Sequence, residues 1–319
     1  MIILDALETR NALPYPKLID AVEQMFATGC AMPDRLHYPV PVPGEPDATL
    51  LLMPAWQTGT YLGVKMVTVF PGNGNRALPS IAGTYLLSSG LTGELLAVID
   101  GTELTARRTA AASALAARFL APQQAHTMLM VGTGALAINL IEAHALVRPI
   151  ETVLVWGRNP EKAEKTAQAA RHLGLAADVT TDLRQACGRA DLISCATLSE
   201  TPLIYGDWLK PGTHLDLVGA FKPSMRESDD RCVQRAEIYV DTKAGALHEG
   251  GDLVQPMKAG LLSEDRIRGT LSDLVTGAVA GRSDETAITL FKSVGAALED
   301  LAGAILAFET SIQQASGES

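Results

Sequence analysis

A glycine-rich turn near the middle of the chain limits the possible fold more than any other feature. Residues 132–137 are Gly-Thr-Gly-Ala-Leu-Ala, between an apolar run at 127–131 and an amphipathic stretch at 135–147. This spacing predicts a strand, a tight turn at Gly132 and a helix, with Gly134 allowing the backbone to approach a phosphate. We expect the free amides at the start of the helix, near Ala135 and Leu136, to bind the pyrophosphate of a dinucleotide.

The next apolar run, 152–156, ends in Gly157, Arg158 and Asn159. This is about 20 residues past the turn, where dinucleotide-binding folds place the residue that contacts the adenosine ribose. An acid there would bind the ribose 2′-hydroxyl, whereas an arginine suits a 2′-phosphate. Lys162 follows one helical turn later. The segment therefore predicts NADPH as cofactor, with NADH also possible.

The pattern around this turn predicts two domains of an α/β protein. From residue 127 onward, short apolar strands alternate with helices such as 135–147 and 160–173, which predicts a doubly wound parallel sheet of the Rossmann type. The expected strands are 127–131, 152–156, 177–180, 191–195, 213–218 and 237–241. Before residue 119, successive strands without helices between them predict a smaller, mainly antiparallel sheet. Its expected strands are 48–53, 61–70, 83–87 and 94–99, and helices are expected near 16–26 and 103–119.

The domain boundaries follow from proline and from a long helical pattern. Pro122 marks the entry to a dinucleotide-binding domain that we place at 120–294. The stretch 289–308 predicts an amphipathic helix that returns to the first domain. The smaller mixed α+β domain therefore comprises residues 1–119 and 295–319, and we expect the ligand cleft between the two domains.

Composition excludes several classes of function. The net charge of −10 opposes nucleic-acid binding, because no basic face is easily assembled. The cysteines and histidines lack metal-binding spacings, so no metal site is predicted. The chain contains no apolar run of about 18 residues, and its first residues are too short and acidic for a signal peptide. We therefore expect a cytoplasmic protein without a membrane span.

Two cations interrupt apolar surfaces. Alternation places Lys65 on the same strand face as Val67 and Val69. A lysine on such a face either pairs with an anion or extends its ammonium group into solvent at the end of the strand. Arg108 lies in the middle of the apolar stripe of the helix 103–119. A buried arginine needs an anion, which is either an internal acid or a substrate carboxylate.

Other polar residues carry no such signal. Arg35 lies in a loop between proline-marked segments and is interpreted as a surface residue. Residues 228–230 and the pair Glu299-Asp300 are interpreted as solvated helix faces. The segment 248–252 is interpreted as a polar turn that could line a cleft, without an assigned role.

Together, these residues resemble the ornithine cyclodeaminase/mu-crystallin family over essentially the whole chain. The motifs that carry the resemblance are Leu52-Met53-Pro54, Gly63-Val64-Lys65, the stretch 104–111, the glycine turn, Val218-Gly219-Ala220 and the stretch 291–295.

The resemblance implies a homodimer whose first domain supplies the substrate site and the dimer contact. It implies that Lys65 and Arg108 are catalytic and that both hold the substrate carboxylate with Arg35, which changes the interpretation of Arg35. Further substrate contacts are implied for Met53, Ser80, Phe221 and Val294, and cofactor contacts for Thr197, Val218, Gly219 and Ser293.

Two departures from the family pattern bear on the reaction. Cyclodeaminases of this family carry a glutamate where this chain has Leu51, and a catalytic aspartate where it has Phe221. Phenylalanine is neither a general base nor a partner for an ammonium group. The stretch 219–223 followed by Met225-Arg226-Glu227 resembles the ketimine reductase branch instead.

That branch implies reduction of Δ1-pyrroline-2-carboxylate, Δ1-piperideine-2-carboxylate or both by NAD(P)H, with L-proline or L-pipecolate as products. The preferred ring size stays open. The alternatives are an ornithine cyclodeaminase, an amino-acid dehydrogenase, a reductase of open-chain imines, and a non-catalytic NADPH-dependent binder of small ligands.

Overall fold

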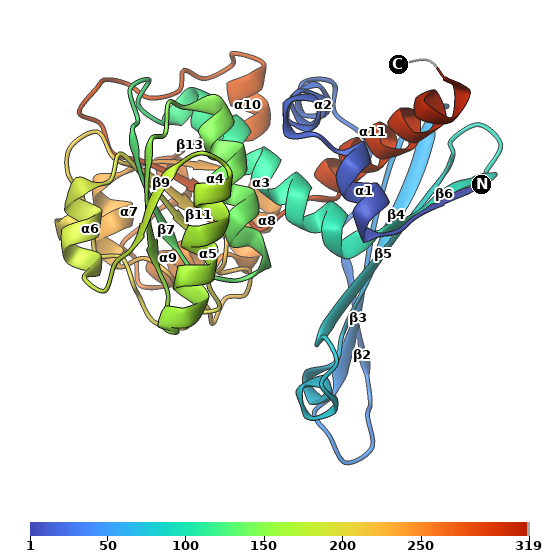
Figure 1. Ribbon diagram of the computed structural model, residues 1–319, viewed down its shortest axis with the longest axis horizontal. Helices are drawn as coiled ribbons and strands as arrows, with labels where there is room; N and C mark the ends of the chain where they lie inside the picture. Colours follow the sequence, from blue (N-terminus) through green and yellow to red (C-terminus); the bar gives the residue numbers. More distant parts are fainter. Residues whose placement is uncertain (318–319) are drawn as a thin grey trace. The chain divides into compact units, whose positions relative to one another are not determined.

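The computed structural model describes residues 1–317 of the 319-residue chain. It contains two compact units, one formed by residues 1–108 with the segment from Ala297, the other by residues 109–296 (Figure 1). The division passes through one helix, α3 (Gly101–Leu120), between Arg108 and Thr109. The predicted domain boundary at residues 119–120 falls at the end of the same helix. Every helix within residues 1–317 is too short or too polar to cross a lipid bilayer.

The first unit is built on a six-stranded sheet in the order β1-β6-β5-β4-β3-β2. Its strands are β1 (Ile2–Leu4), β2 (Leu36–Val40), β3 (Ala48–Gln57), β4 (Tyr61–Val69), β5 (Ile81–Ser89) and β6 (Leu95–Asp100), with a short 3₁₀ helix at Pro71–Arg76. All neighbours pair antiparallel except β1 and β6. The sheet is thus mainly antiparallel, as predicted, and the two edge strands β1 and β2 were not anticipated.

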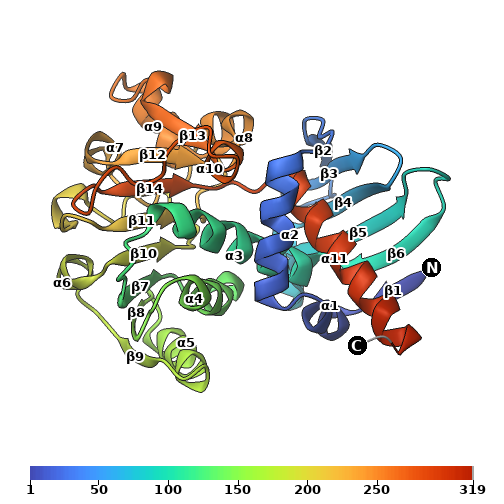
Figure 2. The same ribbon diagram turned by 90° about the horizontal axis from the view of Figure 1, so that it is seen from above.

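One face of this sheet is covered by helices. The helices of the first unit are α1 (Ala6–Ala12), α2 (Tyr15–Thr28), the beginning of α3 and α11 (Ala297–Ser316). α11 packs against β3, β4 and β5, and α2 packs against α11 (Figure 2). α2 buries Leu18, Ile19 and Val22, which recur at helical spacing and form the stripe that this packing requires.

The second unit is a doubly wound α/β fold, as predicted. Within the described residues its sheet has eight strands, all parallel, in the order β13-β12-β14-β11-β10-β7-β8-β9 (Figure 2). The strands are β7 (Thr127–Val131), β8 (Thr152–Trp156), β9 (Ala176–Val179), β10 (Leu192–Cys195), β11 (His214–Leu217), β12 (Glu237–Val240), β13 (Ile267–Thr270) and β14 (Thr289–Lys292). The strand order reverses between β7 and β10, which is where folds of this class bind ligands.

Helices connect these parallel strands. They are α4 (Ala135–Val147), α5 (Pro160–His172), α6 (Leu183–Arg189), α7 (Asp230–Arg235), α8 (Lys243–Glu249), α9 (Gly251–Lys258) and α10 (Leu271–Val275), with 3₁₀ helices at Gly206–Trp208 and Glu264–Arg266. One core layer combines Leu129, Ile193 and Leu215 of the sheet with Cys187 and Val233 of the covering helices.

Two sequence predictions about this sheet were wrong. It has eight strands rather than six, because β13 and β14 were not anticipated. Residues 289–292 were predicted to begin the last helix, but they form the buried strand β14 between β11 and β12. The helix begins only at Ala297, after a segment in which the Asp241 carboxylate accepts hydrogen bonds from the backbone amides of Val294 and Gly295.

Candidate active site

The predicted glycine turn lies between β7 and α4. Gly132 has a φ of 118°, and a Cβ at this position would stand 2.5 Å from the Ala196 carbonyl oxygen, so only glycine fits. Gly134 is the N-cap residue of α4. Glycine has no side chain, so the N-cap position supplies no side-chain hydrogen bond to the first amides of the helix. The first amides of α4 are therefore available to an anion, which the helix dipole also favours.

A cavity of about 360 Å³ opens beside this turn. The predicted cofactor residues in its wall are Gly132, Gly134, Gly157, Arg158, Asn159, Lys162 and Thr197. The wall also contains residues that were not predicted as cofactor contacts, namely Thr133, Trp156, Ala196, Leu198, Ser199 and Leu203. Arg158 and Lys162 are both exposed there, so two cations border a cavity that begins at an uncapped helix end. This combination fits a dinucleotide that carries phosphate at both places.

Asn159, a residue of the cavity wall, also caps α5, with its side-chain oxygen accepting from the Lys162 amide at 3.0 Å. The other predicted cofactor residues do not line the cavity. Val218 and Gly219 are buried in the loop after β11, outside the residues that line the cavity. Ser293 is also buried, and its hydroxyl donates to Asp241 at 2.9 Å. Ala135 and Leu136 belong to the first turn of α4 rather than to the cavity wall.

The first unit brings Lys65 and Arg108 together around a shared acid. The Lys65 ammonium lies 2.7 Å from one carboxylate oxygen of Asp300, and the Arg108 Nε lies 2.7 Å from the other. A second acid, Glu299, pairs with an Nη of Arg108 at 2.5 Å. All four side chains are buried. The prediction that Glu299 and Asp300 form a solvated face was therefore wrong.

Burial and charge act against each other in this cluster. Burial lowers the pKa of Lys65 to about 8, although Asp300 raises it. Burial alone would raise the pKa of Asp300, but Arg108 and Lys65 hold it below its ordinary value. The acids likewise raise the pKa of Arg108 against the effect of burial. At neutral pH Lys65 and Arg108 are thus cations beside an ionised Asp300.

The remaining predicted substrate residues lie at several places. Met53 of β3 is buried and pairs with Lys65 of β4 across the sheet. Arg35 is half-buried directly before β2, and Ser80 is exposed directly before β5. In the second unit, Phe221 is 36% exposed after β11. Val294, also of the second unit, is half-buried after β14.

The burial of Asp300 could have been predicted from one pattern in the sequence. Asp300 is spaced three, four and seven residues before Gly303, Ala304 and Ala307, all of which are buried on α11. A charged residue on a stripe of small residues indicates burial and a partner. A second missed group, Glu227 with Asp252 and Lys292, is wholly buried in the other unit, so the interpretation of residues 248–252 as a polar turn was also wrong at Asp252.

The family model of the ornithine cyclodeaminase/mu-crystallin family matches residues 2–314. The chain belongs to this family. The Δ1-pyrroline-2-carboxylate reductase of Paracoccus denitrificans is 40% identical to it over 261 residues, which are 81% of this chain and 82% of that protein.

Solved structures of the same fold agree over nearly the whole chain. One is a Δ1-pyrroline-2-carboxylate reductase of Thermococcus litoralis in complex with NADH and L-proline, 33% identical, with a TM-score of 0.92 over 99% of this chain and 98% of that one. Another is an archaeal alanine dehydrogenase dimer with bound NAD, 29% identical, with a TM-score of 0.90 over 98% of this chain and 96% of that one.

Proposed function

We propose that this chain is an NAD(P)H-dependent reductase of cyclic imino acids. Its substrates are Δ1-pyrroline-2-carboxylate, Δ1-piperideine-2-carboxylate or both, and its products are L-proline and L-pipecolate. The observation that carries this proposal is the buried pair Lys65 and Arg108 in a chain that also has a dinucleotide cavity. The match to a reductase bound to NADH and L-proline supports it.

The carboxylate of the imino acid requires cationic donors. The described contacts of Arg108 use its Nε and one Nη, so the second Nη can still donate to a ligand. Lys65 adds an ammonium with three donors, and Arg35 is the third cation that we assign to the carboxylate. Because Asp300 and Glu299 already fix Arg108, its planar guanidinium is oriented before a substrate arrives.

The ring of the substrate requires apolar surroundings. Leu51 lies on the same face of β3 as Met53, two residues away, and β3 pairs with β4 at Lys65. In the second unit, Phe221 stands where a cyclodeaminase of the family has its aspartate. Ring methylenes need no charged partner, whereas the distal ammonium of ornithine would lack an acid at either place. The two positions therefore favour imine reduction over cyclodeamination.

Reduction of the imine adds a hydride to the carbon and leaves a proton on the nitrogen. A bound nicotinamide supplies the hydride, and the ring nitrogen either enters protonated or takes its proton from Lys65 or solvent. A lysine with a pKa near 8 can both hold a carboxylate and release a proton near neutral pH. Arg158 and Lys162 favour NADPH, and NADH is the second cofactor that we expect to be used.

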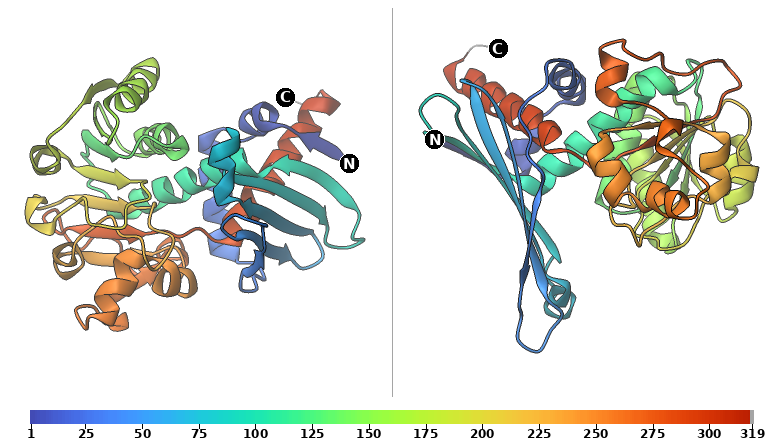
Figure 3. Two further views of the ribbon diagram at one scale, coloured as in Figure 1. Left: turned by 90° about the horizontal axis from the view of Figure 1, so that it is seen from below. Right: turned by 180° about the vertical axis from the view of Figure 1, so that it is seen from behind.

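We also propose that the protein is a homodimer. α11 covers one face of the six-stranded sheet, whereas the opposite face has no helix of the same unit against it in the described chain (Figure 3). This uncovered face includes Leu36, Leu62, Met66 and Leu86, each at least 37% exposed. A contiguous apolar sheet face is typical of a contact with a second copy of the chain.

The proposal is tested by measuring NADPH oxidation with both cyclic imines. Ornithine alone, and pyruvate with ammonia or methylamine, serve as comparison substrates. We expect turnover with at least one cyclic imine and at most weak turnover with the comparison substrates. Ammonia release from ornithine would indicate a cyclodeaminase, and NADPH binding without any turnover would indicate a non-catalytic binder; either result would reject the proposal.

A further inference from the structure

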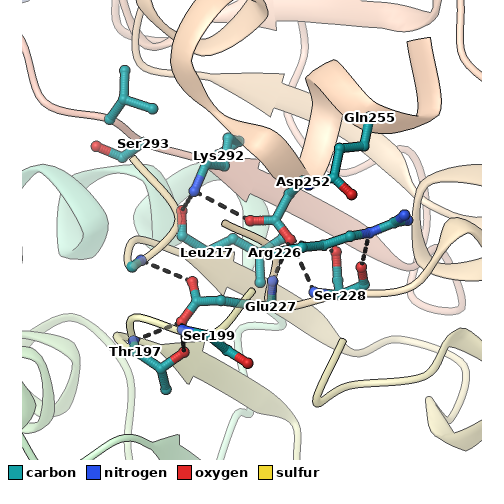
Figure 4. Close-up of polar contacts among 12 residues, drawn as sticks. Thr197, Ser199, Leu217, Arg226, Glu227, Ser228, Asp252, Gln255, Lys292 and Ser293 are labelled. Atoms are coloured by element: carbon teal, nitrogen blue, oxygen red, sulfur yellow. Dashed lines mark hydrogen bonds and ion pairs between the residues drawn. The ribbon is translucent and has the colours of Figure 1, made fainter. Parts of the chain in front are cut away.

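The sequence motif Met225-Arg226-Glu227 has no role in the proposed reduction of the imine, yet Glu227 is completely buried in the structure. Glu227 lies in the loop that follows β11. One of its oxygens accepts hydrogen bonds from the amide and the hydroxyl of Thr197, at 2.6 and 2.7 Å. Its other oxygen accepts from the Gly219 amide at 2.8 Å (Figure 4). A single carboxylate therefore joins the loops that follow β10 and β11.

These two loops are packed so closely that position 219 has no room for a side chain. A Cβ at Gly219 would stand 2.1 Å from the Thr197 carbonyl oxygen and 2.5 Å from the Glu227 carboxylate. Thr197 lines the cavity beside the glycine turn, whereas Glu227 is not in the cavity wall. Glu227 thus lies behind the residue that faces the ligand, and it acts on the ligand only through Thr197 and its loop.

A second layer of charge holds Glu227 in turn. One oxygen of Asp252, in the first turn of α9, accepts from the backbone amides of Glu227 and Ser228 at 2.8 and 2.9 Å. The other lies 3.3 Å from the Lys292 ammonium, which also donates to the Leu217 carbonyl at 3.2 Å (Figure 4). The cluster of Glu227, Asp252 and Lys292 therefore combines two acids with one base, all of them wholly buried.

We propose that Glu227 is a positioning residue for the dinucleotide, and that ionised Glu227 holds the 196–199 segment in the shape that binds NAD(P)H. This inference rests on the proposed dinucleotide site. An ionised carboxylate accepts all three hydrogen bonds. A protonated one can place its own O–H only on the Thr197 hydroxyl, which then accepts instead of donating, because the other two partners are backbone amides that only donate. Protonation therefore reverses or breaks at least one of the three bonds.

The surroundings of Glu227 place this change near neutral pH. Burial, together with the charge of Asp252, raises the pKa of Glu227 to about 7, against the lowering effect of Lys292 and of the Thr197 bonds. The Cys195 thiol also faces it, and burial keeps that thiol protonated by raising its pKa. The neighbouring Arg226 is engaged by Asp230 and by the Ser228 carbonyl. We therefore expect dinucleotide affinity to fall as the pH drops through about 7.

The test uses Glu227→Gln in the full chain and measures dinucleotide binding by the fluorescence of the reduced nicotinamide. Glutamine keeps the shape but turns one acceptor into an NH₂ donor, which then faces the Thr197 or Gly219 amide. NADH is the main probe, because a 2′-phosphate would itself titrate near pH 6. We expect the Kd of wild type to rise by up to about tenfold per pH unit below pH 7. In Glu227→Gln we expect a Kd at least about tenfold higher than wild type at pH 8, and nearly independent of pH.

Asp216→Asn is the matched control, because Asp216 of β11 is another wholly buried acid of the same unit. It accepts from Ser113, Ser194 and His144, and it is not in the cavity wall. Both variants should lower the melting temperature, but only Glu227→Gln should change the Kd and its pH dependence. Wild-type affinity in Glu227→Gln, or an equal loss in Asp216→Asn, would overturn the proposal. If wild type binds NADH with the expected pH dependence but reduces no imine, the proposed function fails and this inference stands.

Discussion

The ammonium of Lys65 is buried beside Asp300, and its pKa near 8 makes a specific pH dependence expected. Lys65 binds a carboxylate only while it is protonated. As the pH rises through about 8 the group becomes neutral, so kcat/KM for the cyclic imine should fall by up to about tenfold per pH unit. Initial rates between pH 6 and pH 10, at saturating NADPH, measure this limb of the profile.

Two variants separate Lys65 from other titrating groups. Lys65→Arg keeps the charge at every pH of the experiment, since a guanidinium stays protonated, so the alkaline limb should move to higher pH. In Lys65→Met, kcat/KM for the cyclic imine should be low at every pH between 6 and 10. An alkaline limb that stays in place in Lys65→Arg would assign it to a different group.

Arg158 carries the expected preference for the phosphorylated cofactor. Reversal of its charge in Arg158→Glu removes a donor to the 2′-phosphate and adds a repulsion, so kcat/KM with NADPH should fall about a hundredfold. The value with NADH should change far less. Lys165→Glu is the matched control, because Lys165 is an exposed cation of α5, the helix that follows Arg158, and lies outside the cavity. Equal losses with both cofactors would show that Arg158 does not bind the phosphate.

At the scale of residues, the sequence revealed cations more readily than their partners. Arg108 and Lys65 stood out because each interrupts an apolar surface, and both are buried in the structure. Glu299 and Asp300 did not stand out, because two adjacent acids at the start of a helix look like a solvated, dipole-stabilised end. The small residues that follow Asp300 on α11 indicate burial, but the partners of the two acids are cations far away in the chain, and no local pattern shows which cations these are.

At the scale of elements, the connection from β7 to α4 allows stability and binding to be separated. Gly132→Ala places a Cβ 2.5 Å from a carbonyl oxygen in a backbone conformation with φ of 118°, so it should lower the stability of the free protein by about 1–3 kcal/mol. A Cβ at Gly134 meets nothing within 4 Å, and its φ of −82° suits alanine. Gly134→Ala should therefore leave the free protein as stable as wild type.

The two variants should nevertheless both bind NADPH poorly. The Cβ in Gly134→Ala would occupy the space in which the pyrophosphate approaches the backbone, so we expect a Kd about tenfold higher or more. Thermal unfolding without and with NADPH measures both effects. If Gly134→Ala gains as much stability from NADPH as wild type does, the pyrophosphate does not lie at this turn.

Some elements were predictable from local sequence signals, and others were not. β7, β8 and the turn between β7 and α4 follow from local apolar runs and glycine spacing, and they appear where expected. β14 was missed because its four residues continue into the amphipathic pattern of the following helix. Only its insertion between β11 and β12, and the hydrogen bonds that Asp241 accepts from the segment after it, decide that it is a strand.

At the scale of the whole molecule, the fold class followed from the order of elements, because alternating strands and helices permit few arrangements. The face that a sheet leaves uncovered is harder to predict. β4 alternates Leu62, Val64 and Met66 on one face with Lys65, Val67 and Val69 on the other, so both faces carry apolar residues in the sequence. Only the position of α11 shows which face remains for a partner.

The uncovered face makes the oligomeric state a decisive measurement. If a second copy of the 33.7 kDa chain packs on it, wild type should sediment as a dimer at micromolar concentration. Leu86→Asp puts a charge at the middle of this face, where burial without a partner is costly, so it should raise the dimer dissociation constant at least a hundredfold. Leu91→Asp is the control, since Leu91 is 81% exposed in the turn between β5 and β6. Monomeric wild type, or equal dissociation in both variants, would show that this face does not form the dimer.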